Sequence, residues 1–290
     1  MTKYTEFSGE KITICLTSAC NIKCKHCYID YSGAWDIQEL KELIPIWRQK
    51  YKVSLNGAEP LTNLEYLNLY SLAGYHNIFT NGKAIVDNPN IMEHMKRNGI
   101  DHVAISYHLG SEVSPLSTQM VERAIFLLVN SGFEVEIMTT ISKQNYKQID
   151  SICDKALELG AKQLYLLNYI KKGNGVNGDK YVLSADEIKE FVTTMTRIRE
   201  KYPKEQLYIQ RAGLFDSQKY ITKDCFECYA CRHAVITPEK KIYPCIFCID
   251  ANYQIGHLEG QTLLVSPSSI DALPLGNGCL ACNIYNGQYL

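Results

Sequence analysis

Residues 11–28 read KITICLTSACNIKCKHCY, a short apolar run followed at once by three cysteines. The run over residues 11–17 is rich in β-branched and apolar side chains, which is typical of a buried strand. Cys20, Cys24 and Cys27 follow in the next loop. Parallel barrels place their chemistry in the loops at the carboxyl ends of strands. We therefore expect the three thiols to form part of a site at the end of the first strand.

Strand-like and helix-like segments alternate from residue 11 to about residue 210. This order is typical of repeated βαβ units around a parallel sheet, and six units predict an α/β fold with a partial (β/α)6 TIM-like barrel. A different, cysteine-rich module follows, so we expect domains at residues 1–211 and 212–290. Strands are expected at 11–17, 51–57, 76–82, 102–108, 133–142 and 163–170, and helices at 36–44, 88–99, 117–132, 146–160 and from the capping-box sequence at Ser184 onward.

The composition excludes several classes of partner. Thirty basic and 31 acidic residues give a net charge of -1, so there is no electrostatic reason to expect nucleic acid or an anionic membrane surface. The N-terminus lacks the apolar region of a secretory signal, and no stretch approaches the roughly 20 apolar residues that span a bilayer. We expect a cytoplasmic protein that binds neither nucleic acid nor membranes.

Cysteines are unusually frequent in this chain and are clustered. Ten of the 12 lie in residues 20–27 and 225–282, while Cys15 and Cys153 stand apart in apolar patterns typical of a core. Disulfides do not persist in a reducing compartment, so clustered thiols indicate metal ligands or redox groups. One alternative is a structural zinc site at the first cluster, completed by His26 or a distant residue.

The first cluster resembles the motif of the radical S-adenosylmethionine superfamily. Cys20-x3-Cys24-x2-Cys27 has the family spacing, and Tyr28 supplies the aromatic residue that follows it. The resemblance implies that the three cysteines hold a 4Fe-4S cluster and that Tyr28 contacts adenine. It also implies that S-adenosylmethionine chelates the open iron and is reduced to methionine and a 5'-deoxyadenosyl radical. Three protein ligands for four irons agree with a catalytic site, which keeps one position open.

Further likenesses to this family follow the next strands. Gly57-Ala58-Glu59-Pro60 resembles the turn that holds the methionyl amino group, with Ala58 where the family has a second glycine. His108 stands where many relatives carry an acidic residue, which puts a ribose contact there in doubt. The resemblance implies that the nucleoside pocket includes Asn81, Ser106 and Thr140.

The second cysteine region resembles the twitch domain, the reduced relative of the SPASM domain, which holds an auxiliary 4Fe-4S cluster. A β-hairpin is expected in residues 234–245, where PEKK forms the turn. The resemblance implies four ligands: Cys231, Cys245, Cys279 and Cys282.

Three cysteines of this region remain, and they leave alternatives open. Cys228, Cys231 and Cys245 also resemble the auxiliary site of the molybdenum-cofactor cyclase that acts on GTP. Cys225 has no assigned role, and Cys248 could bind iron or serve as a catalytic hydrogen-atom donor. The whole region could instead be a zinc ribbon.

The implied reaction is hydrogen abstraction from a ribosomally made peptide, followed by epimerisation or cross-linking. The alternatives are a radical epimerase or dehydrogenase of a sugar or aminoglycoside, and a non-catalytic zinc protein. A flavodoxin or ferredoxin would donate electrons. About ten residues precede the first strand, so no leader-binding domain is expected there, and residues 171–179, KKGNGVNGD, predict a flexible surface loop.

Overall fold

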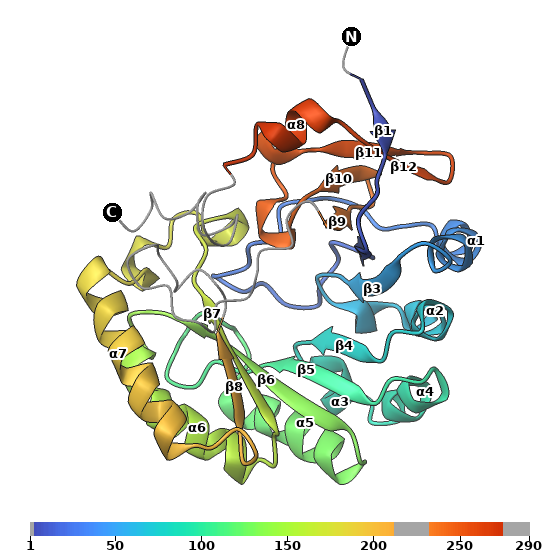
Figure 1. Cartoon of the computed structure of the whole chain (residues 1–290). Coiled ribbons are helices and arrows are strands. Elements are labelled where there is room, and N and C mark those ends of the chain that lie inside the picture. Colours follow the sequence, from blue (N-terminus) through green and yellow to red (C-terminus); the bar gives the residue numbers. More distant parts are fainter. Residues whose placement is uncertain (1–2, 212–231, 275–290) are drawn as a thin grey trace.

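A computed structural model of the chain describes residues 3–211 and 232–274. Its first sheet contains five parallel strands that neighbour one another in chain order (Figure 1). Side chains of the central strands, such as Ile105 and its register partner Ile137, are fully buried. The strands are β4 (Asn77–Thr80), β5 (His102–Ser106), β6 (Glu134–Ile141), β7 (Gln163–Asn168) and β8 (Tyr208–Arg211).

The second sheet brings together strands from both ends of the chain. Its seven strands lie in the order β1-β12-β11-β10-β9-β2-β3, and β2 pairs in parallel with both β3 and β9. Strands from both sides of residue 211 therefore share one sheet, while the division into two domains stays a prediction. The strands are β1 (Thr5–Glu6), β2 (Lys11–Cys15), β3 (Lys52–Asn56), β9 (His233–Ile236), β10 (Lys241–Tyr243), β11 (Gly256–Glu259) and β12 (Thr262–Val265).

Helices lie between successive parallel strands (Figure 1). Their buried apolar side chains pack on the sheets. In α7 the buried side chains Ile188, Phe191, Met195 and Ile198 recur every three or four residues. The capping box predicted at Ser184 and Glu187 forms at its start. The helices are α1 (Ile37–Trp47), α2 (Leu67–Ala73), α3 (Lys83–Asp87), α4 (Ile91–Arg97), α5 (Thr118–Asn130), α6 (Ile149–Glu158), α7 (Ala185–Lys201) and α8 (Pro267–Asp271).

The six predicted strands all form, as β2 to β7, and the α/β fold with parallel strands is confirmed. The finer expectation of a six-unit partial barrel stays a prediction. The hairpin is also confirmed, because β9 and β10 pair antiparallel around a turn in which Lys240 has a φ of 63°. Strand β8 was missed, since it is only four residues long and its Tyr208 is exposed.

In the part of the chain that the structure describes, no helix is long and apolar enough to cross a membrane.

Candidate functional site

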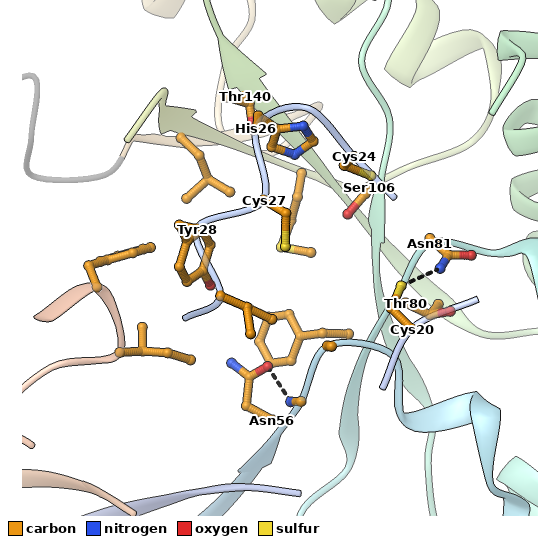
Figure 2. A pocket seen from close by; sticks show the side chains of 18 of the residues that line it. Cys20, Cys24, His26, Cys27, Tyr28, Asn56, Thr80, Asn81, Ser106 and Thr140 are labelled. Carbon is orange, nitrogen blue, oxygen red and sulfur yellow. Dashed lines mark hydrogen bonds between the residues drawn. The ribbon is translucent and has the colours of Figure 1, made fainter. Parts of the chain in front are cut away.

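A cavity of about 470 Å3 opens at the carboxyl ends of the parallel strands. The predicted ligands Cys20, Cys24 and Cys27 all line it, with Cys20 exposed and the other two partly buried. Figure 2 shows these three side chains around the same pocket, with Cys24 and Cys27 on either side of His26 in one loop. The structure thus brings together the thiols that the spacing singled out.

Hydrogen bonds from the end of β3 hold the loop that leads into the cysteines. The backbone N–H of Ala58 donates to Thr17 O at 2.8 Å, and that of Glu59 donates to Ala19 O at 3.1 Å. Since β2 and β3 are parallel neighbours, the loops after them meet at the same edge. Gly57 and Ala58 line the cavity beside the cysteines, as expected from the turn sequence.

Glu59 lies behind this wall and does not line the cavity. It is fully buried, and its carboxylate accepts hydrogen bonds from Thr80 Oγ1 at 2.9 Å and from the backbone N–H of Asn81 at 2.7 Å. A third bond comes from the N–H of Leu61 at 3.2 Å. Burial raises the pKa of Glu59 to about 7, and the three donors oppose that rise. The carboxylate thus links the end of β3 to the end of β4 through hydrogen bonds. A contact between this carboxylate and the methionyl amino group stays a prediction.

The other predicted pocket residues all lie on the cavity wall. Asn81, Ser106 and Thr140 come from the ends of β4, β5 and β6. Asn81 Nδ2 donates to Asn21 Oδ1 at 2.8 Å and lies 3.7 Å from the sulfur of Cys20, which links the end of β4 to the cysteine loop (Figure 2).

Tyr28 also lines the cavity, and its ring packs edge-on against Phe247 with centroids 5.1 Å apart. Burial raises the pKa of Tyr28 above its usual range, so its hydroxyl stays protonated. Phe247 belongs to the segment between Cys245 and Cys248. The contact joins the first cysteine motif to the second cysteine region.

Two buried polar groups of the cavity wall lack partners among the described residues. His108 Nδ1 accepts the backbone N–H of Thr140 at 3.1 Å, and burial holds the pKa of His108 well below its usual value. The neutral ring therefore carries its proton on Nε2, which has no acceptor, and the Oδ1 of Asn168 has no donor. Because unpaired buried polar groups are costly, the wall is suited to a polar ligand. Asn168 was not predicted as a pocket residue; it ends β7, two residues before the predicted end of that strand.

Without a bound metal, the three thiols keep their protons at neutral pH. Burial raises the pKa of Cys24 to about 11, and it also raises the pKa of Cys20 and of Cys27. In residues 3–211 and 232–274 no three Cys, His, Asp or Glu side chains converge on a point where one metal ion could bind. His26, the fourth ligand in the zinc alternative, donates from Nδ1 to Val113 O at 3.2 Å.

Of the second cysteine region, the structure describes only Cys245 and Cys248. Cys245 is partly buried at the end of the hairpin, and Cys248 is fully buried in the turn Ile246–Cys248. Ile246 and Phe247 line the cavity, but Cys248 does not. The remaining predicted ligands and unassigned cysteines lie outside the described residues: Cys225, Cys228, Cys231, Cys279 and Cys282.

Comparison with known sequences finds several enzymes that are similar to half of this chain or more. No protein-family model matches the chain. It is 25% identical over 196 residues to the AdoMet-dependent heme synthase of Nitratidesulfovibrio vulgaris, covering 60% of this chain and 52% of that enzyme. It is 30% identical over 164 residues to the mycofactocin maturase MftC of Mycolicibacterium smegmatis, covering 50% and 41%. A probable GTP 3',8-cyclase of Sulfurisphaera tokodaii is 23% identical over 269 residues, covering 86% and 84%. The chain thus spans about half the length of the heme synthase that it matches.

Solved structures share the fold. The enzyme anSMEcpe with bound AdoMet (S-adenosylmethionine) superposes with a TM-score of 0.67 at 18% identity, covering 90% of this chain and 80% of that one. Streptococcus suis SuiB bound to its precursor peptide SuiA gives a TM-score of 0.66 at 15% identity, covering 88% and 63%.

Proposed function

We propose that this chain, whose homologues are radical S-adenosylmethionine enzymes, reductively cleaves S-adenosylmethionine and takes a hydrogen atom from a peptide substrate. The observation that carries the proposal is the convergence of Cys20, Cys24 and Cys27 on one cavity at the ends of the parallel strands. Homologues of this kind use a 4Fe-4S cluster and S-adenosylmethionine. The three thiols and the unpaired polar groups of the wall suit both.

When bound, the cluster supplies one electron to S-adenosylmethionine, whose cleavage gives methionine and a 5'-deoxyadenosyl radical that takes the hydrogen atom. The chain's own groups prepare this step. Burial raises the pKa of each of the three thiols, so iron would have to displace three protons when it binds. Their loop is held from the end of β3 by hydrogen bonds to Thr17 and Ala19.

The remaining wall residues would bind and orient the nucleoside and the substrate. His108 offers an N–H donor, and Asn168 offers an acceptor. Hydroxyl groups of Ser106 and Thr140 suit a ribose, while the packed rings of Tyr28 and Phe247 exclude water from one side. In this proposal Gly57 and Ala58 receive the methionyl end of the cofactor, and Glu59, which is buried behind them, would have to turn toward the cavity to contact it.

An auxiliary cluster on Cys231, Cys245, Cys279 and Cys282 remains part of the proposal. Peptide modification is supported by the likeness to MftC, a maturase, and by the fold shared with SuiB in complex with its precursor peptide. Epimerisation or cross-linking would follow hydrogen abstraction. For epimerisation, Cys248 would return a hydrogen atom, and because its thiol is fully buried, the turn Ile246–Cys248 would have to open toward the cavity.

A small-molecule substrate is the second candidate. It is favoured by the likeness to the probable GTP 3',8-cyclase, which extends over 86% of this chain. A sugar or aminoglycoside would suit the same polar wall. A mass-spectrometric search for modified peptides or sugars in cells with and without the gene would distinguish the two substrate classes.

The decisive experiment uses protein purified without oxygen and reconstituted with iron and sulfide. Dithionite, standing in for a flavodoxin or ferredoxin, and S-adenosylmethionine are added, and 5'-deoxyadenosine is measured by chromatography. We expect the nucleoside from the wild type and from the control variant Cys153→Ala. Cys153 is a buried residue of α6 that does not line the cavity. Cys24→Ala should give none. Colourless zinc-containing protein, or no nucleoside from iron-loaded wild type, would refute the proposal.

A further inference from the structure

The segment after β7, residues 169–175, lies against the backbone of the cysteine loop. Asn174 donates its backbone N–H to Cys27 O at 2.9 Å and its Nδ2 to Cys24 O at 3.2 Å. The hydroxyl of Tyr169 donates to Lys25 O at 3.2 Å. One segment therefore binds three carbonyl groups of the loop that carries the proposed iron ligands.

The close approach of this segment to the cysteine loop requires a glycine at position 173. Its φ of +55° lies in the left-handed region that favours glycine. A Cβ at this position would lie 2.6 Å from Cys27 O and 2.8 Å from Ile29 O, and both atoms belong to the backbone. Any larger residue would have to push the cysteine loop away.

The segment is itself anchored on the protein. The buried ammonium group of Lys172 donates to Ile249 O, beside Cys248, although burial lowers the pKa of Lys172. The ring of Tyr169 is buried and stacks on Tyr181 with centroids 5.4 Å apart. Residues 171–179 were predicted as a flexible surface loop. A surface position is wrong for Lys172 and Gly175, which are buried, while the flexibility of the loop stays a prediction.

The cysteine loop has little regular structure of its own. Between Cys20 and Cys27 there is no helix or strand. Within this loop the N–H of Cys27 donates to Cys24 O at 3.4 Å, and the thiol of Cys20 donates to Asn21 Oδ1 at 4.0 Å. The directions of the thiols therefore depend on contacts from outside the loop. A cluster retained by three thiolates requires those directions to be fixed.

We propose that residues 169–175 form a strap that positions the cysteine loop, with Gly173 and Asn174 as positioning residues for the thiols of Cys24 and Cys27. The inference rests on the proposed function for the identity of the bound cluster. The positioning itself is measurable on metal-free protein. Loss of the strap contacts leaves all three ligands in place but lets their loop move.

The first test compares Asn174→Ala with Asn177→Ala, an exposed asparagine of the same loop with no side-chain hydrogen bond to the cysteine loop in the described structure. Reconstituted proteins are challenged with an iron chelator, and loss of visible absorbance is followed. We expect Asn174→Ala to lose iron about five- to tenfold faster, the factor that corresponds to one net hydrogen bond. Its reduced cluster should also give a broader electron paramagnetic resonance spectrum. Asn177→Ala should match the wild type in both.

The second test separates positioning from backbone strain. Gly260 has the same φ of +55° as Gly173, but a Cβ there meets nothing within 4 Å. Gly173→Ala and Gly260→Ala therefore carry a similar conformational cost, and only the first displaces Cys27 O. We expect Gly173→Ala alone to lose iron faster, while both lower the urea midpoint of the metal-free protein.

Alkylation of Cys24 and Cys27 in metal-free protein, followed by mass spectrometry, makes the outcome independent of iron. Faster alkylation in Asn174→Ala and Gly173→Ala than in their controls supports the strap, even if the wild type takes up no iron and the proposed function fails. Unchanged alkylation and unchanged iron loss overturn it. Equal effects in the two control variants overturn it as well.

Discussion

Glu59 joins two strand ends through a carboxylate that is inaccessible to solvent. It accepts from Thr80, Asn81 and Leu61, and none of these donors carries a charge. Desolvation therefore dominates and raises the pKa to about 7 from the ordinary 4.5. The residue type at position 59 was readable from the turn sequence, but its burial was not, because the donors include a strand end about 20 residues later in the chain.

This pKa predicts a pH-dependent stability. Below about pH 4.5 both folded and unfolded chains are protonated at Glu59, whereas between about pH 4.5 and 7 only the unfolded chain loses the proton. The free energy of unfolding should therefore fall as the pH rises through this window, by an amount on the order of 3 kcal/mol, and then level off. Urea denaturation of metal-free protein on both sides of the window measures it.

Glu59→Gln should lack this part of the pH dependence, because an amide does not titrate there. It should also be less stable at low pH, since the amide nitrogen cannot accept from the surrounding donors. Glu65→Gln, on the exposed turn after Asn63, is the control and should keep the wild-type pH profile. A Glu59→Gln profile parallel to that of the wild type would contradict the assignment.

At the level of elements, β9 is bound to β2 by a side-chain hydrogen bond as well as by backbone pairing. Ser54 on β3 donates its only hydroxyl proton to Ile12 O at 3.1 Å. The hydroxyl of Thr13 therefore donates to Ser54 Oγ at 2.6 Å and accepts from His233 Nε2 at 2.7 Å. This chain of bonds crosses three neighbouring strands. The pairing could not be read from the sequence, because 220 residues separate Thr13 from His233.

Thr13→Val should lower the free energy of unfolding by about 1–3 kcal/mol, since valine keeps the shape but removes the acceptor of His233 Nε2 and the donor to Ser54 Oγ. Thr193→Val on α7 is the matched control, because Thr193 is exposed and bonds only within its own helix. Urea denaturation of both variants measures the difference. Equal stability of the two variants would show that the network contributes nothing.

At the scale of the whole molecule, the seven-stranded sheet joins β1, β2 and β3 to strands that follow residue 232. β9 supplies the fully buried Ala234 and Ile236 next to β2, and β1 pairs with β12. The indole of Trp47 donates to Gln261 O at 2.9 Å. The predicted boundary at residue 211 therefore lies between segments that share a core.

A fragment of residues 1–211 should consequently fail to unfold cooperatively in urea, although it contains all six predicted βα strands. Trp35 and Trp47, the two tryptophans of the chain, are buried, so their fluorescence should shift to the red in the fragment. The full-length chain measured in parallel is the reference. A fragment with the same emission and midpoint would mean that the segment before residue 212 is an independent domain.

The strands, the start of α7 and the cysteine site could be predicted from short stretches of sequence. Apolar alternation over segments such as 102–108 and 133–142 predicted the strands, the Ser184 box predicted the start of α7, and the cysteine spacing predicted the thiols that meet at the cavity. Each of these features depends on residues that are close together in the sequence: the alternation of side chains along a strand, the cap at a helix start and the spacing of cysteines in a short loop.

The tertiary structure decided the rest. It placed β9 beside β2, turned residues 169–175 onto the cysteine loop, buried Glu59 and left the Nε2 of His108 without an acceptor among the described residues. Each of these depends on contacts between segments distant in sequence. Burial and the partners of a polar group are set only when such segments pack together, so no local pattern encodes them.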